Sequence, residues 1–370
     1  MKSKISFAAI DPFVQKAIIE PMERVIPNKN LVEWGDRNGY PDYLLELYNN
    51  VPTLRSIING NIDFVTGDDC TLSPFAGLPS GVVNRRGDTI ADQLTDIAKD
   101  FGIYGGFALQ IIRNGLGEVN EIYYTDMRYL RTNKDCNVFY YCEDWNKPGK
   151  KTPIVYPAFN PVLDWASLTD EGKRTHASSI LFVKNVRTQV YPAPLYAASV
   201  KACEIERSID KFHLNAIANQ FASSAIVNFN NGVPEDEVKE EIERTFNEKF
   251  SGADNAGRVI FSWNDTKESA TDIVEFKVED FGERYKALSD HSRQQIFTAF
   301  RANPNLFGIP TENNGFSNEQ YEESFRLYNR TQIRPIQRLI CDTYDKILGG
   351  KGVLTIKPFS LEGETESKVN

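Results

Sequence analysis

The chain has 370 residues, of which 41% are hydrophobic and 25% charged, a composition that suits a globular protein with two or three subdomains. Its net charge of −9 argues against a broad basic surface that grips nucleic acid, although DNA that slides past the protein is compatible with it. The five cysteines are scattered, and we find neither a signal peptide nor an apolar window long enough to span a membrane, so we expect a reduced, cytoplasmic chain.

The first part of the chain predicts an arm followed by two helices. Residues 1–41 contain many turn-forming residues and are expected to form an extended arm. Over residues 42–65 the apolar side chains recur at helical spacing. Pro52 interrupts this pattern, and we expect it at the start of the second helix, where a missing N–H costs nothing.

The next segment changes from helical to strand periodicity. Asp88 or Thr89 is placed to cap a further helix, and the segments 107–112 and 119–124 flank a turn, which predicts a β-hairpin. Two more strands are expected at 137–142 and 179–184, so that residues 42–192 form an α+β domain with a mainly antiparallel sheet.

A long amphipathic helix is predicted directly after residues 191–194. From residue 195 to 221 the apolar side chains alternate steps of three and four, which predicts a narrow seam that packs on a nearly parallel helix within or between subunits. At 1.5 Å per residue such a helix spans about 40 Å. The seam consists of Leu195, Ala198, Ala202, Ile205, Ile209, Phe212 and Ala216.

A small α/β insert separates this helix from a second long one. The insert is expected to contain a strand at 224–230, a charge-rich helix from Pro234, and strands at 257–262 and 272–276. The charged helix has the composition of a solvated face, but its place between two long helices makes it a candidate docking surface. The second long helix is expected over 281–301.

The C-terminal part predicts a loop and a third helix. A Gly-, Pro- and Asn-rich loop at 304–316 leads into this helix, in which Pro335 is expected to cause a kink or a break. A pair of glycines ends the helix, a last strand covers 353–357, and residues 359–370 form a polar tail.

We find no catalytic or metal-binding constellation in the sequence. No two of the histidines His176, His213 and His291 stand at ligand spacing, and the HExxH, GxSxG and GxGxxG motifs are absent. The glycines of 349–352 end a helix rather than open one, so they are not a phosphate-binding loop. We therefore expect no catalytic residues, no cofactor and no metal.

From Tyr191 onwards the order of elements resembles that of the HK97-like portal proteins of tailed bacteriophages. The resemblance covers residues 191–347, whereas no motif in 42–190 is specific. Its motifs are the Pro-Leu segment at 191–196, the strand at 223–229, the Asn-Ala-Gly turn within 252–257, the Asn-Pro-x-Leu-Phe-Gly-Ile segment at 303–309 and the mid-helix proline within 333–337.

The resemblance implies the subdomains of a portal subunit. A crown is expected to be minimal or absent, because little sequence follows Thr355. The implied parts are an N-terminal arm (1–41), an α/β wing (42–192), two stem helices (193–222 and 278–303), a small α/β clip (223–277), a tunnel loop (304–316), a long kinked helix with a final strand (317–358) and a polar tail (359–370).

The resemblance also implies a function and partners. Portal proteins form rings, usually of twelve subunits, at one capsid vertex of the virion, and are assembled in the bacterial cytoplasm. Double-stranded DNA passes through the ring without sequence specificity, the terminase large subunit and the head–tail adaptor dock on the clip, and the major capsid protein meets the wing. The implied residues are Ile309, Glu312, Asn313, Asn314 and Phe316 in the DNA-facing loop, Arg301 as a transient contact of the DNA backbone, and Asn228, Asn230, Glu235, Glu237 and Lys239 on the clip docking surface.

Two alternatives stay open at this point. One is another ring or adaptor protein of a phage that has no DNA channel, and the other is an enzyme with a dispersed active site. The absence of clustered histidines, cysteines and carboxylates argues against the enzyme. The two long helices with a clip-like insert favour a portal over an adaptor.

Overall fold

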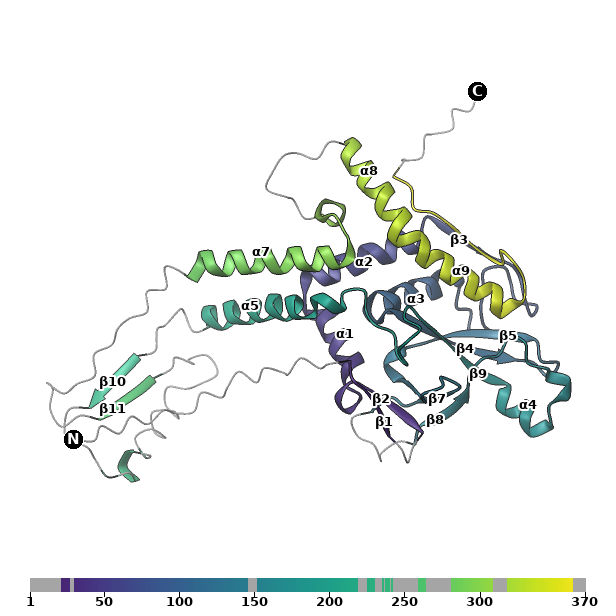
Figure 1. Cartoon of the computed structure of the whole chain (residues 1–370), viewed down its shortest axis with the longest axis horizontal. Helices are drawn as coiled ribbons and strands as arrows, with labels where there is room; N and C mark the ends of the chain where they lie inside the picture. Colours follow the sequence, from purple (N-terminus) through teal and green to yellow (C-terminus); the bar gives the residue numbers. More distant parts are fainter. Residues whose placement is uncertain are drawn as a thin grey trace. The chain divides into compact units, whose positions relative to one another are not determined.

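The computed structural model describes residues 21–26, 30–145, 152–218, 225–229, 235, 237–239, 241, 259–263, 281–308 and 318–361 (Figure 1). The chain divides into two compact units. The larger unit comprises Ile19–Cys203 and Arg293–Asn370, and the smaller unit comprises Met1–Ile18 and Glu204–Ser292.

Three helices near the start of the larger unit follow the predicted pattern. They are α1 (Tyr40–Asn50), α2 (Pro52–Thr66) and α3 (Ile90–Tyr104). Pro52 lies in the first turn of α2, and Thr89 caps α3 in a capping box in which its Oγ accepts from the N–H of Asp92 at 3.2 Å. At the end of α3, Gly105 has a φ of 82°, and a Cβ there would lie 2.0 Å from the carbonyl oxygen of Ala193, so only glycine fits.

The strands of the larger unit form separate antiparallel sheets rather than the single sheet that we predicted. The predicted hairpin is confirmed as β4 and β5, and β9 pairs with the other edge of β4. The three-stranded sheet has the order β5 (Val119–Thr125), β4 (Gly106–Arg113), β9 (Ser178–Lys184). The five-stranded sheet has the order β1 (Glu23–Ile26), β2 (Leu31–Trp34), β6 (Leu130–Thr132), β7 (Val138–Tyr141), β8 (Ile154–Pro157).

The arm predicted for residues 1–41 is wrong for residues 23–26 and 31–34, which form β1 and β2. The two strands are only four residues each, and β2 pairs with β6, where Val32 lies opposite Thr132. Trp34 at the end of β2 is fully buried and stacks on Tyr191 with ring centroids 4.6 Å apart. The sequence pattern of so short a strand is weak, because four residues carry little periodicity.

The two long helices run antiparallel. The first, α5 (Val200–Ala218), follows a 3-10 turn at Ala197–Ser199, and the second is α7 (Phe281–Phe300). In the larger unit the Ser199 hydroxyl donates to the carbonyl of Gln295 at 2.9 Å. In the smaller unit the rings of His213 and Tyr285 lie 5.8 Å apart. Both predicted helices are thus confirmed, although α5 begins five residues later than expected, after the turn that follows Pro194.

In the smaller unit, β10 (Ala225–Phe229) pairs in parallel with β11 (Val259–Trp263). A parallel pair requires a crossover connection, which is where we predicted the charged helix. Residues 237–239 and 241 of that segment are helical. The strand predicted at 272–276 lies outside the described residues, as does the loop from 309 to 317.

The C-terminal helix is interrupted as Pro335 predicts. The α-helix α8 (Asn318–Tyr328) passes into a π turn, η8 (Asn329–Ile333), and then into α9 (Arg334–Leu348). The Arg334 N–H donates to the carbonyl of Asn329, five residues back, and this wider turn accommodates a proline that has no N–H to donate.

The last predicted strand is confirmed, and its pairing partner is new. Gly349 ends α9 with a φ of 70°, and β12 (Leu354–Lys357) then pairs antiparallel with β3 (Asp69–Leu72). Helix α2 packs on both α3 and α9. The chain segment after β12 is thereby held beside α2 and the C-terminal helices (Figure 1).

Candidate functional site

The predicted seam lies partly at the surface of the single chain. In the larger unit, Leu195 is 37% exposed and Ala198 is also exposed, and both precede α5, whereas Ala202 is buried. In the smaller unit, Ile205 is half-buried and Ile209 is buried. The side chains of Phe212 and Ala216 lie outside what the structure describes. The seam therefore stays a prediction, and Leu195 and Ala198 are its exposed members.

The predicted tunnel loop starts from a firmly anchored turn. Phe307 belongs to the 3-10 turn η7 (Pro304–Phe307), and its ring lies 6.0 Å from that of Phe64 and 5.7 Å from that of Tyr328. The Ser56 hydroxyl on α2 donates to the Phe307 carbonyl at 3.2 Å. A Cβ on Gly60 would lie 2.8 Å from the Phe307 ring, so this glycine admits the close approach.

The residues named for the loop itself, Ile309, Glu312, Asn313, Asn314 and Phe316, lie outside the described residues. Arg301 is described: it is exposed directly after α7 and has a φ of 52°, which ends the helix. It precedes the anchored Phe307 by six residues.

Of the clip residues, Asn228 lies in β10 opposite Ser262, and Asn230 falls outside the described part. Glu235 and Glu237 are exposed, and Lys239 is half-buried. Glu237 and Lys239 lie on one short helical segment and Glu235 precedes it, so charged side chains of both signs are present there. Their role as a docking surface stays a prediction.

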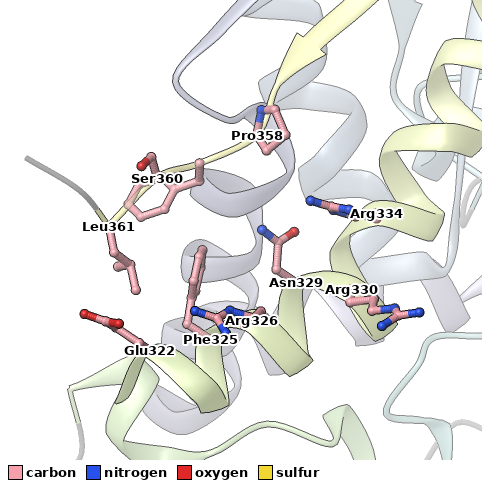
Figure 2. A pocket seen from close by; sticks show the side chains of 10 residues that line it. Glu322, Phe325, Arg326, Asn329, Arg330, Arg334, Pro358, Ser360 and Leu361 are labelled. Carbon is pink, nitrogen blue, oxygen red and sulfur yellow. The ribbon is translucent and has the colours of Figure 1, made fainter. Parts of the chain in front are cut away.

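Sequence reasoning missed a pocket that three arginines line on the C-terminal helix. We call Arg326, Arg330 and Arg334 the arginine row; Figure 2 shows them following one another along the helix, with Asn329 among them and the segment 358–361 opposite. The pocket has a volume of about 770 Å³. The sequence feature that could have predicted this cluster is the four-residue spacing of the arginines from 326 to 338, because residues four apart lie near one another on a helix. The remaining lining residues are Glu322, Phe325, Pro358, Phe359, Ser360 and Leu361.

Aromatic packing fixes the wall of this pocket that residues 358–361 supply. The ring of Phe359 lies 5.3 Å from that of Phe64 and 5.8 Å from that of Phe325. Behind the pocket, the Tyr328 hydroxyl donates to Oδ1 of Asn61 at 2.7 Å. The segment that ends at Leu361 is therefore held in place against α2 and α8.

The residues that line another pocket, of about 530 Å³, include five tyrosines, four of which belong to strands of the two sheets. The Arg86 guanidinium lies 4.7 Å from the ring centre of Tyr123, and the Arg128 guanidinium lies 4.5 Å from that of Tyr129. Beside it, Asp100 is buried, and this burial, followed by the charge of Asp126, raises the pKa of the Asp100 carboxyl well above its usual range.

Within the described ranges no three His, Cys, Asp or Glu side chains gather in a way that would hold a metal ion. His176 lies at the end of the short helix α4 (Asp170–His176), away in sequence from His213 on α5 and His291 on α7. Among the same residues, no helix has both the length and the apolar character that crossing a membrane requires.

Two comparisons with known proteins both indicate phage portal proteins. The family model for phage portal proteins matches residues 86–364. The probable portal protein of Haemophilus phage HP1 is 24% identical over 258 residues, which cover 69% of this chain and 68% of that protein.

Solved structures of gene transfer agent (GTA) particles share the fold. The neck of the native GTA particle, computed with C12 symmetry, has a TM-score of 0.51 at 14% identity and covers 85% of this chain and 83% of its own. The neck of the empty GTA particle, computed with C6 symmetry, also has a TM-score of 0.51 at 14% identity, with coverages of 87% and 85%.

Proposed function

The chain belongs to the phage portal protein family, and we propose that it forms a ring-shaped channel at one capsid vertex through which double-stranded DNA is packaged and ejected. The family match over residues 86–364 is the observation that carries this proposal, because it includes both long helices, the insert between them and the C-terminal helices. It also argues against the adaptor and enzyme alternatives.

The proposed ring contains twelve copies. The neck of the native GTA particle was computed with C12 symmetry, which supports this number. A closed ring needs a heterologous interface that repeats around the axis, and the exposed Leu195 and Ala198 offer apolar surface for it.

The proposed subunit has the portal parts given above. Residues 42–192 form the wing, α5 and α7 the stem, the segment 223–277 the clip, and residues 304–316 the tunnel loop. The antiparallel contacts of α5 with α7 and the parallel pairing of β10 with β11 support the stem and the clip.

The net negative charge of the subunit suits a channel through which DNA slides. Nine net negative charges per copy give twelve copies a charge on the order of −100, which repels phosphates and keeps the duplex from sticking. Arg301, exposed beside the start of the loop, touches the DNA backbone transiently. The anchored Phe307 gives the tunnel loop a fixed base from which Ile309, Glu312, Asn313, Asn314 and Phe316 face the DNA.

The proposed partners are those of a portal in a virion. The terminase large subunit, and later the head–tail adaptor, dock on the clip at Asn228, Asn230, Glu235, Glu237 and Lys239, and the major capsid protein meets the wing. The protein has a structural role without catalysis, and it assembles in the bacterial cytoplasm before it becomes part of the virion.

Negative-stain electron microscopy of the purified chain tests this function. We expect rings with a central hole of about 20 Å or more, the diameter that a duplex with its grooves requires. Particles that stay monomeric at high protein concentration, or rings whose hole is closed, would contradict the proposal.

A further inference from the structure

The pocket on the C-terminal helix has a fixed order of charges. Glu322, Arg326, Arg330 and Arg334 follow one another at four-residue steps, so one acid precedes the arginine row. All four side chains are exposed, and none of them forms an ion pair with another residue that the structure describes. Guanidinium groups bind carboxylates and phosphates with two parallel hydrogen bonds. The pocket therefore suits a ligand with several anionic groups and a cation at one end.

Asn329, between two of the arginines, adds a further requirement. Its side chain is only 8% exposed, and its Oδ1 meets no hydrogen-bond donor among the described residues. A buried acceptor of this kind requires an N–H or O–H group. The ligand of the pocket therefore has to donate a hydrogen bond as well as bring negative charge.

Helix α3 has the complementary order of charges on its solvent-facing side. Asp92 and Asp96 lie four residues apart in the helix, Asp88 precedes them by a further four, and Lys99 follows Asp96. We call Asp88, Asp92 and Asp96 the acidic row. Asp92 and Lys99 are exposed, and the other two are half-buried. The core-facing side of α3 consists of Ile90, Leu94, Ile97 and Phe101.

The acidic row keeps carboxylate oxygens for a further partner. Oδ2 of Asp92 accepts from the Thr89 N–H at 3.1 Å, and Oδ2 of Asp88 accepts from Arg86 at 3.3 Å. Asp96 forms no ion pair within the described part of the chain. These carboxylates are therefore able to accept from guanidinium groups of another molecule.

A second copy of the chain fits the pocket better than a nucleic acid does. Phosphates would bind the arginines and the N–H groups of bases would reach Asn329, but a nucleic acid brings no cation to Glu322. Helix α3 of another copy brings Lys99 to this acid and aspartates to the arginines. It also brings the exposed Thr95, whose hydroxyl donates to the Ala91 carbonyl in the single chain and is able to turn to Oδ1 of Asn329.

We propose that the arginine row of one copy pairs with the acidic row of a neighbouring copy, with the two helices antiparallel. Four residues at 1.5 Å each place successive charges about 6 Å apart in both rows. A closed ring joins two different surfaces of each copy, as these rows do, so the contact rests on the proposed ring and specifies one of its interfaces. The pairs are Arg326 with Asp96, Arg330 with Asp92, Arg334 with Asp88, and Glu322 with Lys99.

Two single charge reversals, Arg326→Glu and Asp96→Lys, test the pairing on the full-length protein. Each variant places like charges opposite each other at every contact. We therefore expect each to need about tenfold more protein than the wild type before half of it is in rings, measured by analytical ultracentrifugation over a concentration series. Arg338→Glu and Asp135→Lys are the controls, because they change the charge equally at exposed positions outside both rows, and they should assemble as the wild type does.

Recombination of the two reversals identifies the partner. An equimolar mixture of the two single variants should form rings at the concentration that the wild type needs. In this mixture the new glutamate of one variant meets the new lysine of the other, and the unchanged arginine meets the unchanged aspartate at the alternate contacts. The double variant Arg326→Glu/Asp96→Lys should recover as well, because each of its contacts again joins opposite charges.

Rings of wild-type stability in both single variants would overturn this contact and leave the proposed function intact. A wild-type chain that forms no ring at any concentration would contradict both. Loss of rings without recovery in the mixture would also overturn the pairing between copies, whether or not the double variant recovers. If Arg326→Glu assembles normally but loses the binding of a duplex of random sequence that the wild type shows, the arginine row is a nucleic-acid surface instead.

Discussion

Arg131 and Asn38, 93 positions apart in the chain, form a double hydrogen bond in the core of the larger unit. Nε of Arg131 donates to Oδ1 of Asn38 at 2.8 Å, and Nη2 donates to the Asn38 carbonyl, also at 2.8 Å. The guanidinium further lies 5.8 Å from the ring centre of Trp34 and 5.2 Å from that of Trp145. Its burial lowers the pKa of Arg131 to about 10. This pair joins the loop after β2 to β6.

Replacing Arg131 by methionine should lower the free energy of unfolding by about 3 kcal/mol, because the carbonyls of Asn38, Arg128 and Leu130 lose the guanidinium donors and Oδ1 of Asn38 keeps only the Trp34 N–H. Denaturant unfolding measures this loss. Arg85→Met is the control, since its side chain is 72% exposed and its contact with Glu121 is worth at most about 1 kcal/mol. A loss for Arg131→Met no larger than that of the control would contradict the structural role.

Asp100→Asn should stabilise the protein at neutral pH. Burial, followed by the charge of Asp126, raises the pKa of Asp100 in the folded state above its unfolded value, so the carboxyl favours folding only while it is protonated. This contribution is complete below pH ~4, the unfolded pKa, and is lost as pH rises through the folded pKa. An asparagine stays neutral and still accepts the Met127 N–H, which lies 3.3 Å from Oδ2 in the wild type.

The melting temperatures of the two proteins, measured from pH 4 to pH 8, check this prediction. The difference should grow in favour of Asp100→Asn as pH rises. Asp135→Asn, at an exposed position, should show no such trend. A constant difference across the range would show that Asp100 does not titrate between the folded and unfolded states as proposed.

Leu195→Glu should prevent ring assembly without unfolding the subunit. Leu195 is 37% exposed in the single chain, so a charge there costs little until a second subunit covers it. Leu214→Glu is a matched control on α5, because Leu214 is 67% exposed and does not belong to the seam. Mass photometry of the three proteins measures the ring fraction; equal loss of rings in both variants would remove Leu195 from the interface.

Deletion of residues 311–315 should leave ring assembly intact and reduce DNA packaging and retention. Residues 311–315 carry no apolar side chain of the kind that forms a core, and the preceding Phe307 is held by Phe64 and Tyr328. Complementation of an infected culture, with DNA content per particle as the readout, measures the effect. Unchanged packaging and retention would exclude the loop from contact with DNA.

Local patterns in the sequence predicted many of the elements but not their partners. Three predicted features depend on hydrogen bonds within a single helical turn. They are the break at Pro52, the cap at Thr89 and the interruption before Pro335. The short strands β1 and β2 escaped prediction, because four residues carry too little periodicity to be recognised. Likewise, the arginine spacing was visible, but nothing local indicated that residues 358–361 would close a pocket over it.

The sequence by itself determined the order of helices, strands and turns and, through the motifs from Tyr191 to Pro335, the portal family. Helix periodicity, caps and turn residues are local signals that span only a few positions. They can therefore be recognised in the sequence without knowledge of the tertiary structure. Only the tertiary structure decided that Arg131 is buried against Asn38, that β12 pairs with β3 and that the arginine row shares a pocket with residues 358–361. These contacts join segments tens to hundreds of residues apart, and their free energy comes from burial and pairing that exist only once the chain has packed.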